Sequence, residues 1–472
     1  MDLSEHVAEK KVFYELDRQQ EVLIRYSTGE QPKIISKRNF IWRDFGPEDE
    51  MYARAIFLGE GCWENLETVS EAQANSVLSK WDAESRARQK TNESAKTGFV
   101  LKGNICYSVD KDTLKTVQAG YLVCLDGKSA GVYTILPETF LTLPLIDYGD
   151  NLIIPGMVDL HIHAPQFAAE NLHTHTVPQK LLTLLDIYDQ YEIFANDLKK
   201  SATTRAVIYS EPHKVASELL MGALEDAGLA AYVSADKDAK EYPGEPTNSI
   251  FAGNICPGSS ESEMETLQWM HTETSLPVLA HFGENSEEMD SRKNHCNENL
   301  DHCDIEPHKK ALVVHCDWST ENELLFMQKH NVFVAHCRKG GYFGFAALRM
   351  YLDRSIPTGL GSENMVEPSN SIFHGISDLL YASKSYQEYI NKNVSPVLFS
   401  EAFYMATKGG GAFFGSVGSF EPGYEFDAVV LDDSMMYPYS PPTLAKRVER
   451  AVRVSLDEEA IIAKYIRGNQ II

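Results

Sequence analysis

Five apolar segments of this chain end in a histidine or an acidic residue, and this repeated ending constrains the fold more than any other feature of the sequence. The first segment, Leu152–Val158, leads into His161-Ile162-His163. The other four end at His281, His315, His336 and Glu363. Polar residues at the carboxyl ends of successive buried strands are typical of a barrel of parallel strands and helices, in which functional residues gather at that end.

The His-x-His pair indicates a metal site. Side chains alternate along a strand, so we expect His161 and His163 to point the same way while Ile162 points into the packing. Zinc prefers a few imidazole and carboxylate ligands, with one position left open for water in a catalytic site. Such a set could come from His161, His163, His281, His315 and Glu363. A purely structural role for an isolated His-x-His is the alternative, and the other strand ends weigh against it.

Taken in order, these segments resemble the amidohydrolase superfamily, and within it the guanine deaminases. The resemblance covers about residues 98–472, with matching stretches at Pro155–Gln166, His281–Asn285, Gly359–Glu363 and Glu401–Gly410. It implies an α/β fold with a (β/α)8 TIM-like barrel over residues 156–415. A small flanking β-sandwich would combine residues 98–155 with 416–472, and residues 1–97 would form a small N-terminal α+β extension of unknown role.

The resemblance also implies roles for individual residues. Three histidines match the ligands of one Zn²⁺ per chain: His161, His163 and His281. Glu284 matches the proton-shuttling acid, His315 the histidine that contacts the metal-bound water, and Gln166 a group that reads the purine edge. The implied reaction converts guanine and water to xanthine and ammonia by attack of zinc-bound hydroxide, because zinc brings the pKa of a bound water to about 7.

Several positions depart from the family pattern. Glu363 stands where the family has an aspartate that touches zinc and accepts the proton of the water, and its extra methylene displaces the carboxylate by ~1.5 Å. The arginine that contacts the base is missing near Ser249–Asn254, and Arg338–Gly341 replaces a substrate loop. Two alternatives therefore stay open: a divergent amidohydrolase acting on another small cyclic amidine or amide, and a catalytically weak homologue acting as a binding or regulatory protein.

Other metal-like or reactive residues have simpler interpretations. Structural zinc sites usually show closely spaced cysteine pairs, so the set around residues 295–308 is interpreted as a surface insertion: His295, Cys296, His302, Cys303 and His308. A second His-x-His, His173 and His175, follows no apolar strand and indicates a loop. We expect His336 to be a buried structural histidine and Cys316 and Cys337 to be small buried hydrophobic residues.

Charge and composition limit the partners. The formal net charge of −25 argues against polyanionic partners, so a free nucleobase is a better ligand than a nucleic acid. No apolar run reaches the ~18 residues of a membrane span, and Met1–Glu5 lacks a basic signal-peptide start. Eight cysteines without disulfide-like pairing fit a reducing cytoplasm. A homodimer is what the family resemblance implies.

Local patterns predict individual elements. In the N-terminal extension we expect strands at Glu21–Tyr26 and Lys33–Ser36, a helix opened by a capping box at Ser70–Gln73 and ending near Arg88, and a linker at Glu84–Gly98. In the barrel we expect strands at Thr204–Tyr209 and Ala230–Ser234 around a helix at Lys214–Ala227. Predicted sandwich strands include Phe99–Tyr107, Ala119–Cys124, Ser129–Leu136, Phe426–Leu431 and Ala460–Ile466.

Overall fold

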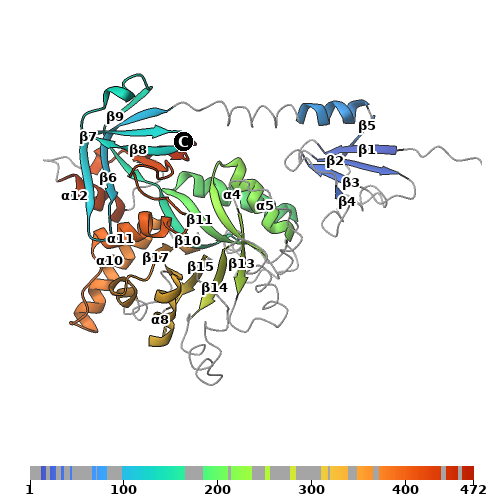
Figure 1. Cartoon of the computed structure of the whole chain (residues 1–472). Coiled ribbons are helices and arrows are strands. Elements are labelled where there is room, and N and C mark those ends of the chain that lie inside the picture. The colour runs from blue at the N-terminus through green and yellow to red at the C-terminus, as the bar shows by residue number, and fades with distance from the viewer. Residues whose placement is uncertain are drawn as a thin grey trace, which may run out of the picture. The chain divides into compact units, whose positions relative to one another are not determined.

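The chain, seen in a computed structural model, forms two compact units, Met1–Lys96 and Thr97–Ile472 (Figure 1). The structure describes residues 12–17, 22–27, 33–36, 43–44, 66–70, 72–81, 98–164, 184–210, 214–235, 250–255, 277–282, 310–316, 319–337, 348–364, 371–436, 443–454 and 460–472. Among these residues, none of the helices combines the length and apolar content that a membrane crossing requires.

The smaller unit is an antiparallel sheet with a helix over 72–81. Its strand order is β4-β3-β2-β1-β5, with the strands β1 (Val12–Asp17), β2 (Val22–Ser27), β3 (Lys33–Ser36), β4 (Arg43–Asp44) and β5 (Leu66–Val69). The predicted capping box is confirmed, because Ser70 N donates to Gln73 Oε1 at 2.8 Å and Gln73 N donates to Ser70 Oγ at 3.3 Å. The predicted helix end near Arg88 and the linker lie outside the described residues.

The larger unit contains a mixed sheet of seven strands in the order β21-β20-β19-β9-β6-β7-β8. Its strands are β6 (Phe99–Ser108), β7 (Leu114–Leu125), β8 (Lys128–Tyr133), β9 (Leu145–Pro155), β19 (Ala428–Leu431), β20 (Ile461–Ile466) and β21 (Asn469–Gln470). Only β6 and β9 pair in parallel, and the other neighbours are antiparallel. Segments from both ends of the unit therefore share one sheet. Short 3₁₀ helices at Glu138–Phe140 and Ser434–Met436 lie between its strands in sequence.

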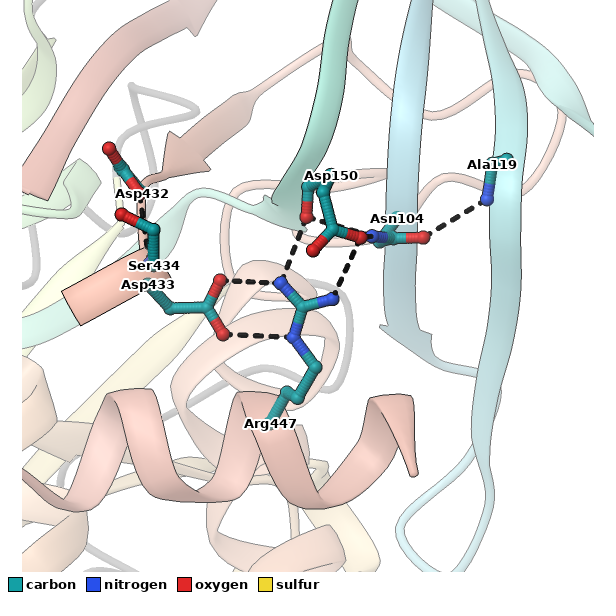
Figure 2. Close-up of polar contacts among 7 residues, drawn as sticks. All are labelled: Asn104, Ala119, Asp150, Asp432, Asp433, Ser434 and Arg447. Carbon is teal, nitrogen blue, oxygen red and sulfur yellow. Dashed lines mark hydrogen bonds and ion pairs between the residues drawn. The ribbon is translucent and has the colours of Figure 1, made fainter. Parts of the chain in front are cut away.

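Arg447 holds the helix α12 (Leu444–Arg453) against this sheet (Figure 2). Its guanidinium donates to both carboxylate oxygens of Asp433, at 2.9 and 2.6 Å, and to the backbone oxygen of Asp150 at 2.9 Å. The side-chain amide of Asn104 on β6 donates to the same backbone oxygen at 2.8 Å. Two-point pairs of arginine with a carboxylate are among the stronger charged hydrogen bonds, so this cluster fixes α12 over the strands.

Lys464 of β20 joins the seven-stranded sheet to the helix α4 (Leu184–Lys200). The side chain is fully buried, and its Nζ donates to three backbone oxygens, those of Leu198, Lys199 and Ser201, at 2.9 to 3.0 Å. Carbonyls at the end of a helix have no partner inside the helix, and the negative end of the helix dipole favours a cation there. Lys464 therefore serves as the C-terminal cap of α4.

The second sheet of the larger unit is parallel, with the order β17-β16-β15-β14-β13-β12-β11-β10-β18. Its strands are β10 (Met157–His163), β11 (Thr203–Tyr209), β12 (Ala230–Ala235), β13 (Ile250–Ile255), β14 (Val278–Phe282), β15 (Ala311–His315), β16 (Phe333–Cys337), β17 (Thr358–Gly361) and β18 (Glu363–Asn364). The strands β17 and β18 stand at opposite ends of this order, yet only Ser362 separates them in sequence. The two edge strands of the sheet are therefore connected in sequence through Ser362.

Among the described residues, helices follow β10, β11 and β15 in sequence and pack on one face of the sheet. The predicted helix after β11 is confirmed as α5 (Lys214–Asp226), and β15 is followed by α8 (Glu321–His330). Ile162 packs with Phe194 of α4 and Leu220 of α5 on the helix side, whereas the opposite face carries a separate apolar cluster with Leu160 and Val314. A third cluster packs β15 and β16 against α8.

Three C-terminal helices share an apolar core with residues of both sheets of the larger unit. These are α10 (Ile372–Tyr389), α11 (Phe399–Tyr404) with its continuation as a π-helix over Met405–Gly409, and α12. Phe373, Phe403 and Val448 from these helices share one core with Leu152 and Met157, which lie in the two different sheets. The larger unit is therefore packed around continuous apolar contacts between its two sheets.

Candidate metal centre

The two histidines of the His-x-His pair lie together on β10, as predicted from strand alternation. His161 is fully buried and His163 is partly buried, and their Nε2 atoms are 3.0 Å apart. Ile162 points to the helix side. A β-bulge precedes it, because Asp159 and Ile162 pair with Ala206 and Ile208, so that β10 has one residue more than β11 over this stretch. Bulges redirect side chains next to functional sites, and this one includes His161.

Tyr209 at the end of β11 packs against both imidazoles. It is the register partner of His163, and its ring stacks on that of His163 with the ring centres 5.0 Å apart. The same ring meets the edge of His161 at 4.6 Å. Since Tyr209 is itself buried, it restricts the orientation of the two histidine rings. The sequence indicated Tyr209 only as the last residue of a strand.

Glu363 brings a carboxylate to the same place from β18, the strand that pairs with β10. It is the register partner of Ile162, and its Oε2 lies 3.6 Å from His161 Nε2 and 3.6 Å from His315 Nε2. The residue is 6% exposed and has φ of +72°. A glutamate rarely adopts this left-handed conformation, and such strained residues cluster at functional sites. In this conformation the Glu363 carboxylate lies 3.6 Å from both imidazoles.

His315 ends β15 and also has a left-handed backbone, with φ of +71°, followed by Cys316 with φ of +58°. The carbonyl oxygen of Cys316 accepts a hydrogen bond from the Tyr351 hydroxyl and another from Ser319 Oγ at 2.9 Å. These bonds hold the turn in which the strand ends. His315 is thereby aimed at Glu363, and its ring lies edge-to-face with that of His161, with the ring centres 5.5 Å apart.

Three pairs of donor atoms are spaced as two ligands of one metal ion require. Zinc bound at ~2.0–2.1 Å in tetrahedral geometry places two ligand atoms about 3.3 Å apart, close to the separations of 3.0 and 3.6 Å found here. Two groups of ligand atoms within 4.8 Å of one another share Glu363: His161 with His163, and His315 with Cys337. Imidazole and carboxylate donors suit zinc, so the residues present fit that ion.

The other residues predicted for the site are only partly described. His281 lies on β14 as the register partner of Val314, next to the strand that ends at His315. Glu284 and Gln166 lie outside the described residues, as do the second His-x-His, the cluster at 295–308 and the segment Arg338–Gly341. The strand β13 covers most of the stretch that lacks the family's arginine.

The residues interpreted as structural are buried, as predicted. Cys316, Cys337 and His336 are at most 5% exposed. Burial lowers the pKa of His336 to about 4, so this imidazole is neutral at neutral pH. Cys337 packs in the cluster with Leu160, while His336 precedes it on β16 and belongs to the other face of the strand.

Asp159 is a polar residue of the site that the sequence analysis quoted without giving it a role. It is fully buried, and burial raises the pKa of its carboxyl to about 7. Its Oδ1 accepts from the backbone nitrogens of His161 at 3.0 Å and Ser362 at 3.1 Å, and its Oδ2 accepts from Ser362 Oγ at 2.5 Å. Aspartate often bonds the backbone two residues on, and its place two residues before His161 was the available signal.

The sequence of this chain is similar to those of known proteins. The sequence profile of the Amidohydrolase family matches residues 152–471. A guanine deaminase of Dictyostelium discoideum is 24% identical over 379 residues, which cover 69% of this chain and 84% of that protein.

Solved structures of deaminases are also similar to this chain. The structure of a guanine deaminase from C. acetobutylicum with guanine bound in its active site is 30% identical with a TM-score of 0.71, covering 80% of this chain and 100% of that one. An adenosine deaminase from Xanthomonas campestris with bound zinc has a TM-score of 0.63 at 15% identity, covering 79% and 92%. The part of the chain that they cover has a TIM-barrel-type α/β fold.

Proposed function

The chain belongs to the amidohydrolase family, and we propose that it is a hydrolytic deaminase that converts guanine and water to xanthine and ammonia. The observation that carries this proposal is the convergence of His161, His163, His315 and Glu363 at strand ends, where His163 lies 3.0 Å from His161, and Glu363 lies 3.6 Å from both His161 and His315, measured between donor atoms. The 30% identity to a structure that holds guanine supports the choice of substrate.

One zinc ion per chain is the proposed cofactor, held by His161, His163, His281 and Glu363. When bound, zinc would supply a Lewis acid and a water whose pKa is lowered to about 7. The buried pair His161 and Glu363 would hold that water in a site of low polarity, where charges interact strongly. His315, 3.6 Å from Glu363, would donate a hydrogen bond to the attacking oxygen.

In the proposed reaction the carboxylates of Glu363 and Glu284 transfer the protons. Glu363 would take the proton of the attacking water as a new C–O bond forms at the carbon that carries the amino group. Glu284 would carry the other proton of this water to the ring nitrogen, and the proton taken by Glu363 would then pass through Glu284 to the departing amino group, so that the C–N bond breaks, the new C–O bond becomes a carbonyl and ammonia leaves. Gln166 would hold the purine edge by hydrogen bonds from its side-chain amide.

The proposal also includes the complete fold, the oligomeric state and the cellular location. The strands β17 and β18 would be two halves of the last strand of a closed (β/α)8 barrel over residues 156–415, since only Ser362 separates them. Residues 98–155 and 416–472 would form the flanking sandwich, and residues 1–97 a separate extension. The protein would act as a cytoplasmic homodimer on a free nucleobase.

The first test measures zinc per purified chain in the wild type and in a His161→Ala, His163→Ala double variant. We expect about one equivalent in the wild type and none in the variant, because two of the ligands are removed. Release of ammonia from guanine is then followed for the wild type and Glu284→Gln. The Glu284→Gln variant should keep its zinc and lose turnover, since only the proton carrier is changed.

Each outcome of these measurements decides one part of the proposal. A wild type without zinc after supplementation would overturn the metal site. The zinc-loaded wild type could instead release ammonia from another cyclic amidine and not from guanine. In that case the proposed substrate is wrong and the proposed class of reaction is right. Full turnover in Glu284→Gln would remove Glu284 from its role.

A further inference from the structure

The β-bulge on β10 shifts the register between β10 and β11 at the candidate site. The register pairs Asp159 with Ala206 and then Ile162 with Ile208, and the two residues between them, Leu160 and His161, fall at the interruption. A bulge disrupts the ladder at the extra residue. The backbone nitrogen of His161 donates instead to the carboxylate of Asp159, at 3.0 Å.

The same carboxylate of Asp159 binds Ser362, at which the chain stops pairing with β16 and begins to pair with β10. Up to Gly361 the chain pairs with β16, and from Glu363 it pairs with β10. Ser362 lies between these two pairings, and both its backbone nitrogen and its hydroxyl donate to Asp159. One buried side chain thus links the strand of the two imidazoles to the segment that leads into Glu363.

Glu363 depends on this link for its direction. Its φ of +72° follows directly after Ser362, and a glutamate in this conformation is strained unless its surroundings hold it. The strained turn is what carries Oε2 to 3.6 Å from both His161 and His315. Loss of the bonds to Ser362 would allow the turn to relax and the carboxylate to leave the histidines.

We propose that Asp159 is a positioning residue, which sets the distance between the His161 imidazole and the Glu363 carboxylate by fixing the backbone of both. The inference rests on the proposed zinc-dependent function, because that distance matters only if the two groups bind one ion. Asp159 is not among the residues proposed to hold the ion or the substrate, because its carboxylate binds His161 N and both the nitrogen and the hydroxyl of Ser362. Hydrogen-bonded partners of metal ligands typically account for 10- to 100-fold in metal affinity or activity.

The test compares Asp159→Ala with Asp159→Asn. Asparagine has the same shape, so its oxygen can accept from both backbone nitrogens and its NH₂ group can donate to Ser362 Oγ. Alanine removes all three bonds. We expect Asp159→Ala to lose about 10- to 100-fold in zinc affinity, measured by competition with a chromophoric chelator, and Asp159→Asn to remain near the wild type.

Two further readouts separate positioning from plain stability. The visible absorption of the cobalt-substituted protein should change in Asp159→Ala and not in Asp159→Asn, because only the first alters the coordination by Glu363. For guanine, kcat should fall with little change in KM. Ser362→Ala removes only the hydroxyl bond and should give an intermediate loss, which keeps the test available if Asp159→Ala does not fold.

Asp433→Ala provides the matched control, since Asp433 is equally buried and binds Arg447 away from the site. It should lower thermal stability and leave zinc affinity unchanged. If Asp159→Ala behaves in the same way, or Asp159→Asn loses zinc as fully as Asp159→Ala, the inference is wrong. Zinc affinity and the cobalt spectrum test the positioning role of Asp159 even if guanine is not turned over. A failure of this inference can therefore be distinguished from a failure of the proposed function.

Discussion

Gly361→Ala tests whether the candidate site depends on the narrow gap between β10 and β16. Gly361 ends β17, and a Cβ atom there would lie 2.7 Å from His161 Cβ and 2.8 Å from Cys337 Sγ. Carbon atoms in contact prefer a separation of about 3.5–4.0 Å. Because His161 Cβ is fixed to the backbone, side-chain rotation cannot relieve this contact. The added methyl group therefore requires about 1 Å of strand movement.

This movement should affect both stability and chemistry. Overpacking of a core usually costs about 1–3 kcal/mol, and we expect the free energy of unfolding in urea to fall by that amount. A displacement of about 1 Å within a catalytic arrangement can lower the rate about 100-fold, so guanine turnover should fall to about one hundredth. Zinc per chain is measured on the same samples.

Gly375→Ala is the control for this substitution. Gly375 lies in α10, and nothing lies within 4 Å of a Cβ atom at that position. Alanine should raise stability by up to about 1 kcal/mol through helix propensity and leave turnover unchanged. Wild-type stability, zinc content and turnover in Gly361→Ala would refute the steric argument.

Two further predictions concern buried charged or titratable groups. Lys464→Met should lower the free energy of unfolding by about 3 kcal/mol, because three backbone oxygens lose their donor. An unchanged urea midpoint, equal to that of the exposed control Lys200→Met, would contradict the capping role. His336 has a pKa of about 4 in the folded chain against 6.5 unfolded, so the unfolded state binds the extra proton between these values. Wild-type stability should therefore fall by up to about 3 kcal/mol more than that of His336→Leu from pH 7 to pH 4, and parallel curves would disprove this.

Local patterns were sufficient to place several of the strands and one half of the candidate site, whereas β1 and β5 were not predicted. Alternation along β10 correctly put His161 and His163 on one side and Ile162 on the other, because the pattern depends on a few consecutive residues. The strands predicted at Thr204–Tyr209 and Ala230–Ser234 differ from β11 and β12 by one residue at one end. The polar spacing of Ser70 and Gln73 likewise marked a helix start.

The other half of the site was not accessible from sequence, since it depends on contacts between distant residues. The direction of Glu363 follows from a left-handed turn that is held by Asp159, and Asp159 lies 203 positions from its partner Ser362. Tyr209 is matched to His163 by strand register, which no local pattern specifies. The bulge on β10 also appears only once β11 is beside it.

The meeting of both sheet edges at Ser362 has a consequence for the order of assembly. During synthesis His161 and His163 emerge long before Glu363, and until residues 358–364 pair with both β16 and β10 the chain offers two imidazoles without the carboxylate. An ion that prefers the complete set binds the finished fold and stabilises it alone by mass action. Metal retention would thus distinguish fully assembled chains from chains that stopped one segment short.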